Sequence, residues 1–329
     1  MTALAPVLQG FFTDRLARQR QASPHTVAAY RDTLRLLVGF ARTRTGKPPS
    51  RLDLADLDAP LIGAFLDHLE HERHNSVRTR NARLAAIHSL YAYAELRHPE
   101  HAALIARVRA IPVKRHERAI VDFLTPAEID ALLAAPEPTS WHGQRDHALL
   151  QLAVQTGLRV SELTTLRRTD ASLSAGAHVR CHGKGCKERI TPLTSQSVNT
   201  LHAWLTRQPG QPDAPLFPTS RGSQLTRDAV QKLVAKHVAT ATAHGPSLGH
   251  KRVTPHPLRH TAALQLLHAG VDTTVIALWL GHEQIQTTAI YLHADLTIKE
   301  RALARLAAPT TPLGRYRPPD PLLAFLDAL

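Results

Sequence analysis

The segment AHVRCHGKGCKERITPL, residues 177–193, is the one strong strand signal in the chain. Apolar and polar residues alternate on both sides of a Gly-Lys-Gly turn, which is typical of a β-hairpin. The segments before and after it repeat their apolar residues at helical spacing. We therefore expect a mainly α fold of the α+β class, with one small antiparallel sheet.

The first hundred residues predict a bundle of four helices. One of them begins with Ser23 as its N-cap and Pro24 in its first turn, and stops at Gly46. Tyr91 and Tyr93 fall in the last helix, where we expect them to pack in the core rather than to stack on bases. The four predicted segments are 4–20, 23–46, 52–73 and 76–98.

A second domain follows a break in the helical pattern, as the length of 329 residues leads us to expect. The segment AIPVKRHERAIVDF, 110–123, contains a proline and a cluster of charges and is the predicted linker. Thr125, Pro126 and Glu128 then form a capping box that starts a new helix. The sequence 145–168 predicts two helices interrupted at Gly157, and further helical patterns cover 194–207, 226–243, 256–269 and 273–280. The predicted organisation is an N-terminal domain over 1–111, a linker over 112–122, a second domain over 123–308 and a terminal segment over 309–329.

The terminal segment combines a proline-rich connector with the apolar sequence PLLAFLDAL. Its leucines and its phenylalanine fall on one helical face. A short apolar helix on a proline tether cannot bury that face by itself. It must dock either on its own chain or on a neighbouring one.

The charge of the chain points to a polyanionic partner. The net charge is +13 and the pI is about 10.4. There are 18 basic and 10 acidic residues up to Arg115, and 22 and 17 after it, so both domains are basic. Of the 40 basic residues 32 are arginine, whose planar fork suits phosphate oxygens. This pattern favours nucleic acid, with a basic soluble enzyme of arginine-rich composition as the alternative.

We expect a cytoplasmic protein without a membrane anchor. The first twenty residues lack the pattern of a secretory signal. No apolar run approaches the roughly 20 residues that a membrane helix needs. Two cysteines are too few for a disulfide framework.

The 21 histidines and the two cysteines raise the alternative of a metal-binding protein. Cys181, His182 and Cys186 lack a second matched pair, so they make a weak zinc site. His256 and His260 are four residues apart, but a zinc-hydrolase motif needs glutamate after the first histidine, where this chain has Pro257. We therefore expect no metal and no other cofactor.

Four segments place reactive side chains beside turns or helix ends. In TGLRVSELTTLR, Arg159 follows a predicted helix break and Glu162 lies three residues on, so an ordinary ion pair explains both. Lys184 occupies the hairpin turn, where a lysine is common, although the flanking glycines also let a ligand approach the backbone closely. In TPHPLRHTAALQLLHAG, Pro257 is predicted to start a helix, which places His256 at or near the N-cap and Arg259 on the same face.

The fourth segment, WLGHEQIQTTAIYLHAD, has Gly281 at a predicted helix end, then His282 and Tyr291. Alone, Tyr291 is an ordinary half-buried tyrosine. Together with two arginines, a lysine and two histidines, it completes the set that phosphoryl transfer to a tyrosine hydroxyl requires. Arginines stabilise the charge that builds up on phosphorus, while histidine and lysine can move the protons without a metal.

These segments resemble the successive motifs of the tyrosine recombinase (phage integrase) family in order and spacing. The motifs are TGLRVSELTTLR, GKGCKERITPL, HPLRHTAALQLLHAG, LGH and TTAIYLHAD. The resemblance covers about 123–310 as a catalytic domain, and the preceding helices look like the core-binding (SAM-like) DNA-binding domain of that family. It implies a site-specific DNA recombinase of integrase or resolvase type, similar to compact Xer-like and transposon-borne enzymes without an extra arm-binding domain.

The resemblance also implies roles by position. Tyr291 would be the nucleophile that forms a 3′-phosphotyrosyl link to DNA and frees a 5′-hydroxyl. Arg159 and Arg259 would hold the scissile phosphate. Lys184 would be the general acid for the leaving 5′ oxygen. No ATP or metal would be needed, because the protein–DNA link conserves the bond energy.

Three further residues would support this chemistry. His256 would assist proton transfer, His282 would hydrogen-bond the phosphate, and Glu162 would support the first arginine. The implied partner is double-stranded DNA, bound by a homotetramer or by a heterotetramer with a related recombinase on two DNA sites. Each protomer would lend its C-terminal segment to a neighbour.

Two alternatives use the same features. A type IB topoisomerase has a similar residue set and relaxes supercoils, although the simple helical N-terminal half and the terminal segment favour a recombinase. A non-catalytic DNA-binding regulator could keep the fold, although no catalytic position is substituted here.

Overall fold

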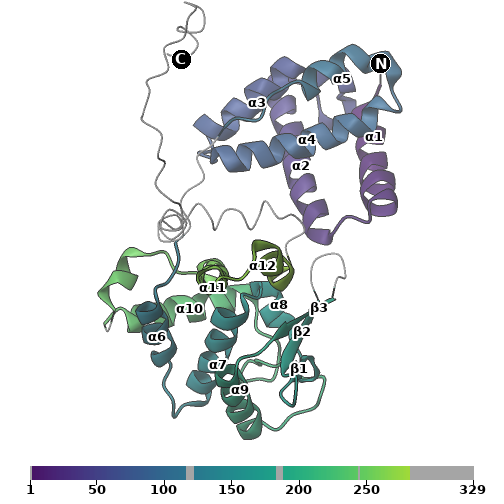
Figure 1. Ribbon diagram of the computed structural model, residues 1–329. Coiled ribbons are helices and arrows are strands. Elements are labelled where there is room, and N and C mark those ends of the chain that lie inside the picture. The colour runs from purple at the N-terminus through teal and green to yellow at the C-terminus, as the bar shows by residue number, and fades with distance from the viewer. Residues whose placement is uncertain (1, 116–121, 183–187, 244, 282–329) are drawn as a thin grey trace, which may run out of the picture. The chain divides into compact units, whose positions relative to one another are not determined.

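The computed structural model describes residues 2–115, 122–182, 188–243 and 245–281. The chain divides into two compact units, Met1–Ala119 and Ile120–Leu329, called here the N-terminal and the C-terminal unit (Figure 1). The predicted terminal segment, 309–329, lies outside the described residues, as does most of the predicted linker. None of the helices in the described ranges combines the length and the apolar character that crossing a membrane requires.

The N-terminal unit contains the four predicted helical segments. Helix α2 starts after Ser23, whose side chain accepts a hydrogen bond from the Thr26 N–H, and Gly46 ends it at φ +71°. Tyr91 and Tyr93 are buried in the core, as predicted. The elements are α1 (Leu4–Gly10), a π-helix that continues it (Phe11–Gln19), α2 (Pro24–Thr45), α3 (Ala59–His71), α4 (Val77–Glu95), α5 (Ala102–Arg109) and three 3-10 turns (Pro49–Arg51, Leu54–Asp56, Pro99–His101).

Helix α5 is an addition to the predicted bundle. It has only eight residues, and it buries Ile105 and Val108 against the same core as α4. Eight residues make only about two helical turns, too few for apolar spacing alone to distinguish a helix from a loop, so tertiary packing decides its structure.

The C-terminal unit is built around α7, which contacts α6, α9 and α11 (Figure 1). This helix buries residues on every side and lies at the centre of the larger apolar core. The predicted capping box of α6 is present: the Thr125 hydroxyl accepts from the Glu128 N–H, and the Glu128 carboxylate accepts from the Thr125 N–H. The helices are α6 (Pro126–Ala134), α7 (Trp141–Thr156), α8 (Val160–Thr165), α9 (Ser195–Arg207), α10 (Arg227–Ala241), α11 (Pro255–His268) and α12 (Thr273–Leu280), with 3-10 turns at Arg168–Asp170 and Pro246–His250.

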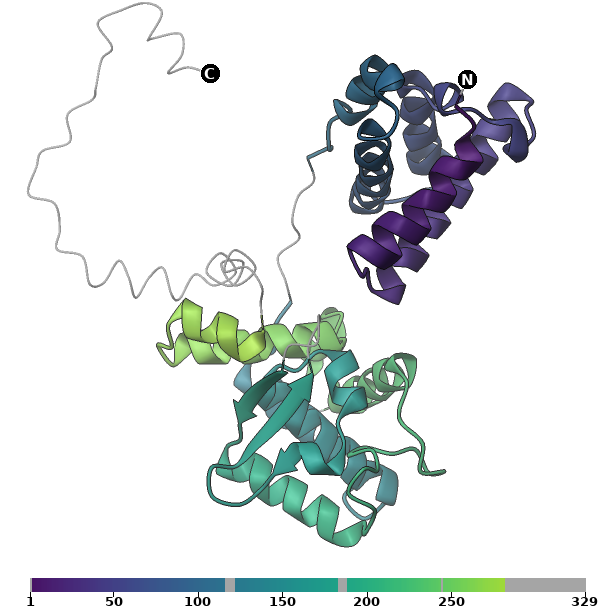
Figure 2. The same ribbon diagram turned by 90° about the vertical axis from the view of Figure 1, so that its right-hand side faces the viewer.

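The predicted hairpin supplies two strands of a three-stranded antiparallel sheet in the order β1-β2-β3 (Figure 2). Its strands are β2 (His178–His182) and β3 (Glu188–Pro192), and the two-residue strand β1 (Ala171–Ser172) pairs with β2. Cys181 lies opposite Arg189 in the register, and both turn towards the protein, whereas Ile190 is exposed. The hairpin turn, 183–187, lies outside the described residues.

Candidate active site

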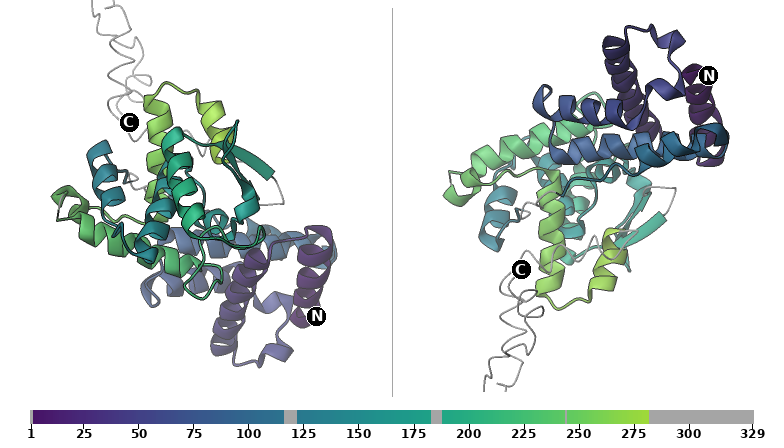
Figure 3. Two further views of the ribbon diagram at one scale, coloured as in Figure 1. Left: turned by 90° about the horizontal axis from the view of Figure 1, so that it is seen from below. Right: turned by 90° about the horizontal axis from the view of Figure 1, so that it is seen from above.

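The site is organised by the C-terminal ends of two helices. Gly157 follows the last residue of α7 at φ +63°, and Gly281 follows the last residue of α12 at φ +65°. This left-handed conformation ends each helix and leaves backbone carbonyls that need donors. Trp279 ties the two ends together, because its Nε1 donates to the carbonyl of Thr156 at 3.0 Å. Figure 3 shows α11 running beside α12, and α11 also packs on α7.

Arg259 of α11 lies between these helix ends. Its side chain is buried, with 4% of its surface exposed. The guanidinium donates to the Gly157 carbonyl and to the Leu280 carbonyl, each at 2.7 Å. A cation is also favoured there by the negative end of each helix dipole. Carbonyl oxygens are neutral, so these bonds fix the guanidinium without cancelling its charge.

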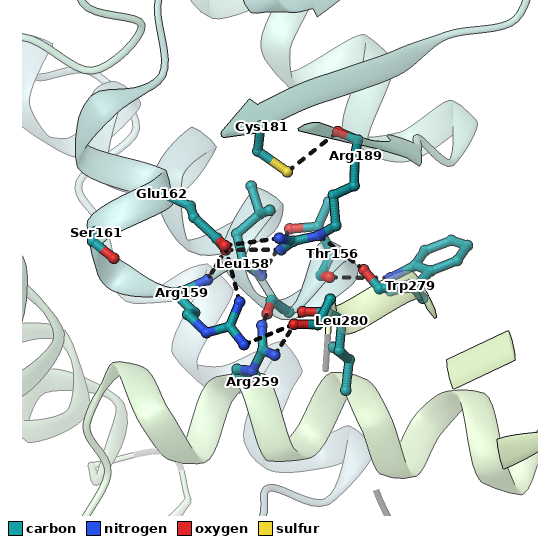
Figure 4. A network of polar contacts seen from close by, with 12 residues as sticks. Thr156, Leu158, Arg159, Ser161, Glu162, Cys181, Arg189, Arg259, Trp279 and Leu280 are labelled. Atoms are coloured by element: carbon teal, nitrogen blue, oxygen red, sulfur yellow. Dashed lines mark hydrogen bonds and ion pairs between the residues drawn. The ribbon is translucent and has the colours of Figure 1, made fainter. Parts of the chain in front are cut away.

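Arg159 reaches the same place from the other side. It is the N-cap residue of α8, and its Nη2 donates to the Gly281 carbonyl at 2.9 Å. Figure 4 shows the guanidinium groups of Arg159 and Arg259 next to each other at the end of α12. The predicted ion pair with Glu162 is also present, at 3.1 Å. The Arg159 side chain is 36% exposed and keeps three of its five N–H donors without a partner among the described residues.

Glu162 is shared with a residue that sequence reasoning missed, Arg189 of β3. The Arg189 guanidinium donates to both carboxylate oxygens, at 2.7 and 2.8 Å, and its Nε donates to the Trp279 carbonyl at 3.1 Å (Figure 4). Burial raises the pKa of Glu162, but the bonds from Arg189 and Arg159 outweigh it and leave this pKa below its usual value. Glu162 is therefore a carboxylate at neutral pH. The alternation of β3 gave the opposite signal, because it would turn the apolar Ile190 inward. The register with β2 instead places Arg189 opposite Cys181 on the inward face and leaves Ile190 exposed.

His256 stands in the first turn of α11. The helix begins at Pro255, two residues before the predicted start at Pro257, which is therefore wrong. Thr254 is the N-cap, and Pro255 fits the first helical position. His256 is exposed, and its ring lies against the buried ring of His260 with a centroid distance of 4.2 Å. Arg259 follows on the same helix face, as predicted.

Glu128 connects the start of the C-terminal unit with the segment before α11. Its carboxylate accepts from Ser247 Oγ at 2.6 Å and from Lys251 Nζ at 2.7 Å, and Lys251 also donates to the Phe123 carbonyl at 2.9 Å. Burial raises the pKa of Glu128, but the bonds from Lys251, Ser247 and the Thr125 N–H outweigh it and lower the pKa to about 2. This network fixes the chain that leads into the arginine-bearing helix.

The structure thus brings Arg159, Glu162 and Arg259 together and places His256 at the start of α11. Three predicted site residues, Lys184, His282 and Tyr291, lie outside the described residues. Lys184 belongs to the turn between β2 and β3, and His282 directly follows Gly281 in the sequence.

Metal ligands do not gather among the residues that the structure describes: no group of three or more histidine, cysteine, aspartate or glutamate side chains could hold an ion there. Cys181 is buried, its thiol donates to the Arg189 carbonyl at 3.5 Å, and burial raises its pKa. It therefore behaves as a packing residue.

Comparison with known proteins agrees with this geometry. Residues 122–297 match the Phage integrase family, and residues 10–98 match the Phage integrase N-terminal SAM-like domain. The chain belongs to the phage integrase family. It is a tyrosine recombinase, an enzyme that cleaves and rejoins DNA strands, and the alternatives of a topoisomerase and of a non-catalytic regulator are not favoured.

The matches to two relatives named as recombinases cover most of both chains. The recombinase is 54% identical over 327 residues to y4rC of Sinorhizobium fredii, an integrase/recombinase by name, covering 99% of this chain and 98% of that one. It is 36% identical over 288 residues to tyrosine recombinase XerC of Pelobacter propionicus, covering 87% and 90% of the two chains. These matches confirm the family predicted from the sequence motifs.

Solved structures show the same fold. The recombinase XerH, in a post-cleavage complex with its palindromic difH substrate, matches with a TM-score of 0.68 and 23% identity over 87% of this chain and 81% of that one. The Tn1549 transposon integrase, in complex with a circular intermediate DNA, matches with a TM-score of 0.67 and 17% identity over 93% of this chain and the whole of that one. The predicted fold class, a helical SAM-like domain followed by a mainly α catalytic domain with a small sheet, is confirmed.

Proposed function

We propose that this recombinase cuts one DNA strand at a time by attack of Tyr291 on a scissile phosphate held by Arg159 and Arg259. The bond from Tyr291 Oη to phosphorus forms while the bond from phosphorus to the 5′ oxygen breaks. The product is a 3′-phosphotyrosyl link and a free 5′-hydroxyl. The observation that carries this proposal is the pair of guanidinium groups held side by side at the end of α12, in a setting that fixes them before any DNA binds.

Preorganisation is what gives such a pair its catalytic value. Attack on a phosphodiester builds negative charge on the non-bridging oxygens, and donors that are already oriented stabilise it without reorganisation. Arg259 is fixed by two neutral carbonyls, and Arg159 by one carbonyl and one carboxylate oxygen. Arg159 also keeps three N–H donors without a partner among the described residues, and these support binding of a phosphate.

The remaining roles concern protons and hydrogen bonds. The hydroxyl of Tyr291 must lose a proton, and the leaving 5′ oxygen must gain one. We assign the second transfer to Lys184 and assistance with the first to His256. His282 would donate to a phosphate oxygen. These side chains can do the work without ATP or a metal ion.

Double-stranded DNA is the proposed partner. The two basic halves of the sequence and the DNA-bound complexes of XerH and Tn1549 integrase support it. Four protomers on two sites, as a homotetramer or with a related recombinase, would carry out the exchange. The apolar segment PLLAFLDAL, 321–329, would dock on a neighbouring protomer.

The test is strand exchange on a defined site. Duplexes bound by the Tyr291→Phe variant are selected from random-sequence DNA, and two copies of the selected site are placed on a supercoiled plasmid. With wild-type protein in EDTA and without ATP, we expect deletion or inversion between the copies. Relaxation of a plasmid that lacks the site, without exchange, would instead show a topoisomerase.

A further inference from the structure

Arg189 connects three elements that carry or adjoin proposed site residues in the sequence. It sits on β3, directly after the turn that contains Lys184, and it binds Glu162 of α8 through two hydrogen bonds. Its Nε donates to the carbonyl of Trp279 near the end of α12. The side chain is 12% exposed, so water hardly competes for these bonds.

The guanidinium of Arg189 also packs closely on Gly281. A Cβ atom built on this glycine would approach Arg189 Nη1 to 2.9 Å. The carbonyl of Gly281 is the acceptor for Arg159 Nη2. Arg189 thus contacts both residues that hold the Arg159 guanidinium. These are Glu162, through its carboxylate, and Gly281, whose carbonyl accepts from Arg159.

The charges explain why a second arginine matters here. If the buried Glu162 carboxylate paired only with Arg159, it would cancel the charge of the Arg159 guanidinium. It would also compete with a phosphate for the N–H donors of Arg159. Arg189 instead donates to both oxygens of Glu162 at short distances. The guanidinium of Arg159 keeps one longer contact of 3.1 Å, while the second bond from Arg159 comes from its uncharged backbone N–H at 2.7 Å. Burial lowers the pKa of Arg189, but the bonds to Glu162 outweigh it and keep this pKa above its usual value. It therefore stays charged.

We propose that Arg189 is a positioning residue for DNA cleavage: by neutralising Glu162 it leaves the charge and the free donors of Arg159 available to the scissile phosphate. This inference rests on the function proposed above for Arg159. Arg189 itself contacts no reacting atom. It acts through Glu162 and through the end of α12.

The experiment measures single-turnover cleavage by saturating protein on the selected duplex, with either a phosphodiester or a neutral methylphosphonate at the scissile position. In Arg189→Gln, Glu162 loses its main partner and pairs fully with Arg159. We expect cleavage of the phosphodiester to slow about 100-fold, as for loss of one preorganised donor. On the methylphosphonate, where less charge needs to be stabilised, we expect a loss of less than about 10-fold, since the effect acts through charge.

A second substitution separates electrostatics from packing. Adding Glu162→Gln to Arg189→Gln removes the unpaired carboxylate but keeps an acceptor for the Arg159 N–H, so cleavage should recover at least about 10-fold. Arg189→Lys keeps the charge without the fork and should lose less than Arg189→Gln. The control is Arg180→Gln, which removes an exposed arginine from the neighbouring strand β2 and should discriminate little between the two substrates.

Equal losses on the two substrates, or no recovery in the double variant, would overturn the proposal and leave Arg189 a packing residue. If Arg189→Gln fails to fold, Arg189→Lys decides, because its loss must also be larger on the phosphodiester. Failure of the proposed function has a different signature. In that case wild type does not cleave the phosphodiester duplex, or Tyr291→Phe cleaves it equally well.

Discussion

Gly157 offers a direct test of how the arginine pair is held. Its φ of +63° is one that alanine adopts with strain, and a Cβ atom there would meet Leu280 Cδ2 at 2.7 Å and Ala262 Cβ at 3.1 Å. Leu280 is fully buried, and the Cβ of Ala262 is fixed to the backbone of α11. The substitution Gly157→Ala should therefore push α11 and α12 away from the end of α7.

The expected loss of unfolding free energy in Gly157→Ala has two parts. An L-residue in the left-handed region costs about 1–2 kcal/mol. Overpacking a closed interface adds about 1–3 kcal/mol. The matched control is Gly176→Ala, since Gly176 has φ +73° but nothing within 4 Å of its Cβ position. We expect a loss in the free energy of unfolding of about 2–5 kcal/mol for Gly157→Ala and of only about 1–2 kcal/mol for the control.

The assay is urea unfolding followed by tryptophan fluorescence. All three tryptophans (Trp141, Trp204 and Trp279) belong to the C-terminal unit, so the signal reports on that unit alone. With a slope near 2 kcal/mol/M, the midpoint should fall by about 1–2.5 M in Gly157→Ala and by about 0.5–1 M in Gly176→Ala. DNA cleavage should slow in the first variant only, because the Gly157 carbonyl holds Arg259.

Equal destabilisation of the two variants would refute this reasoning. It would mean that the backbone conformation alone explains the cost and that the ends of α7 and α12 do not need close contact. Normal cleavage by a strongly destabilised Gly157→Ala would contradict the link between this contact and the position of Arg259.

Three further predictions concern Arg259, Glu128 and the C-terminal segment. Arg259→Lys keeps the charge but loses the fork between two carbonyls, so single-turnover cleavage should fall about 100- to 1,000-fold while folding, followed by fluorescence, persists. The folded-state pKa of Glu128, about 2, lies below the ordinary 4.5, so its stabilising contribution is complete above pH 4.5 and is lost as the pH falls towards 2. The difference in unfolding free energy between wild type and Glu128→Gln should therefore shrink over that range, and a constant difference would argue against the network. Deleting 317–329 should spare binding to one site in gel-shift assays but impair pairing of two sites, and unchanged recombination would contradict a role for this segment in assembly.

Helix ends were the part of the fold most open to prediction from sequence. Ser23, Thr125 and Gly157 have local signatures, because capping and left-handed φ values depend on the residue itself. The structure confirms all three. Strand β1 and helix α5 have no such signature. The two residues of β1 form a strand only because they pair with β2, and the eight residues of α5 form a helix because they pack on the core of the N-terminal unit.

The site also combines residues that the sequence reveals with contacts that depend on the tertiary structure. Arg159, Glu162 and Arg259 could be found because their motif spacing is read directly from the chain. Their main anchors could not be found in this way, because the acceptors are the carbonyls of Gly157, Leu280 and Gly281, and any residue has a carbonyl.

Arg189 is a harder case. The alternation of β3 would bury Ile190 and expose Arg189, whereas the register that pairs Cys181 with Arg189 turns the arginine inward, where it needs an acid. Choosing Glu162 as that acid requires knowledge of how the sheet packs on α8. That packing is tertiary, and no sequence period encodes it.

The measurement that tests the central claim most directly is a covalent trap. Wild type, Tyr291→Phe and Arg259→Lys are incubated with a nicked duplex of the selected site, whose short cleaved fragment diffuses away and leaves the protein attached. We predict a protein–DNA adduct on a denaturing gel with wild type, much less with Arg259→Lys and none with Tyr291→Phe, and a peptide containing Tyr291 linked to the 3′ phosphate. An adduct of equal yield from Tyr291→Phe, or a linkage to another residue, would contradict the account.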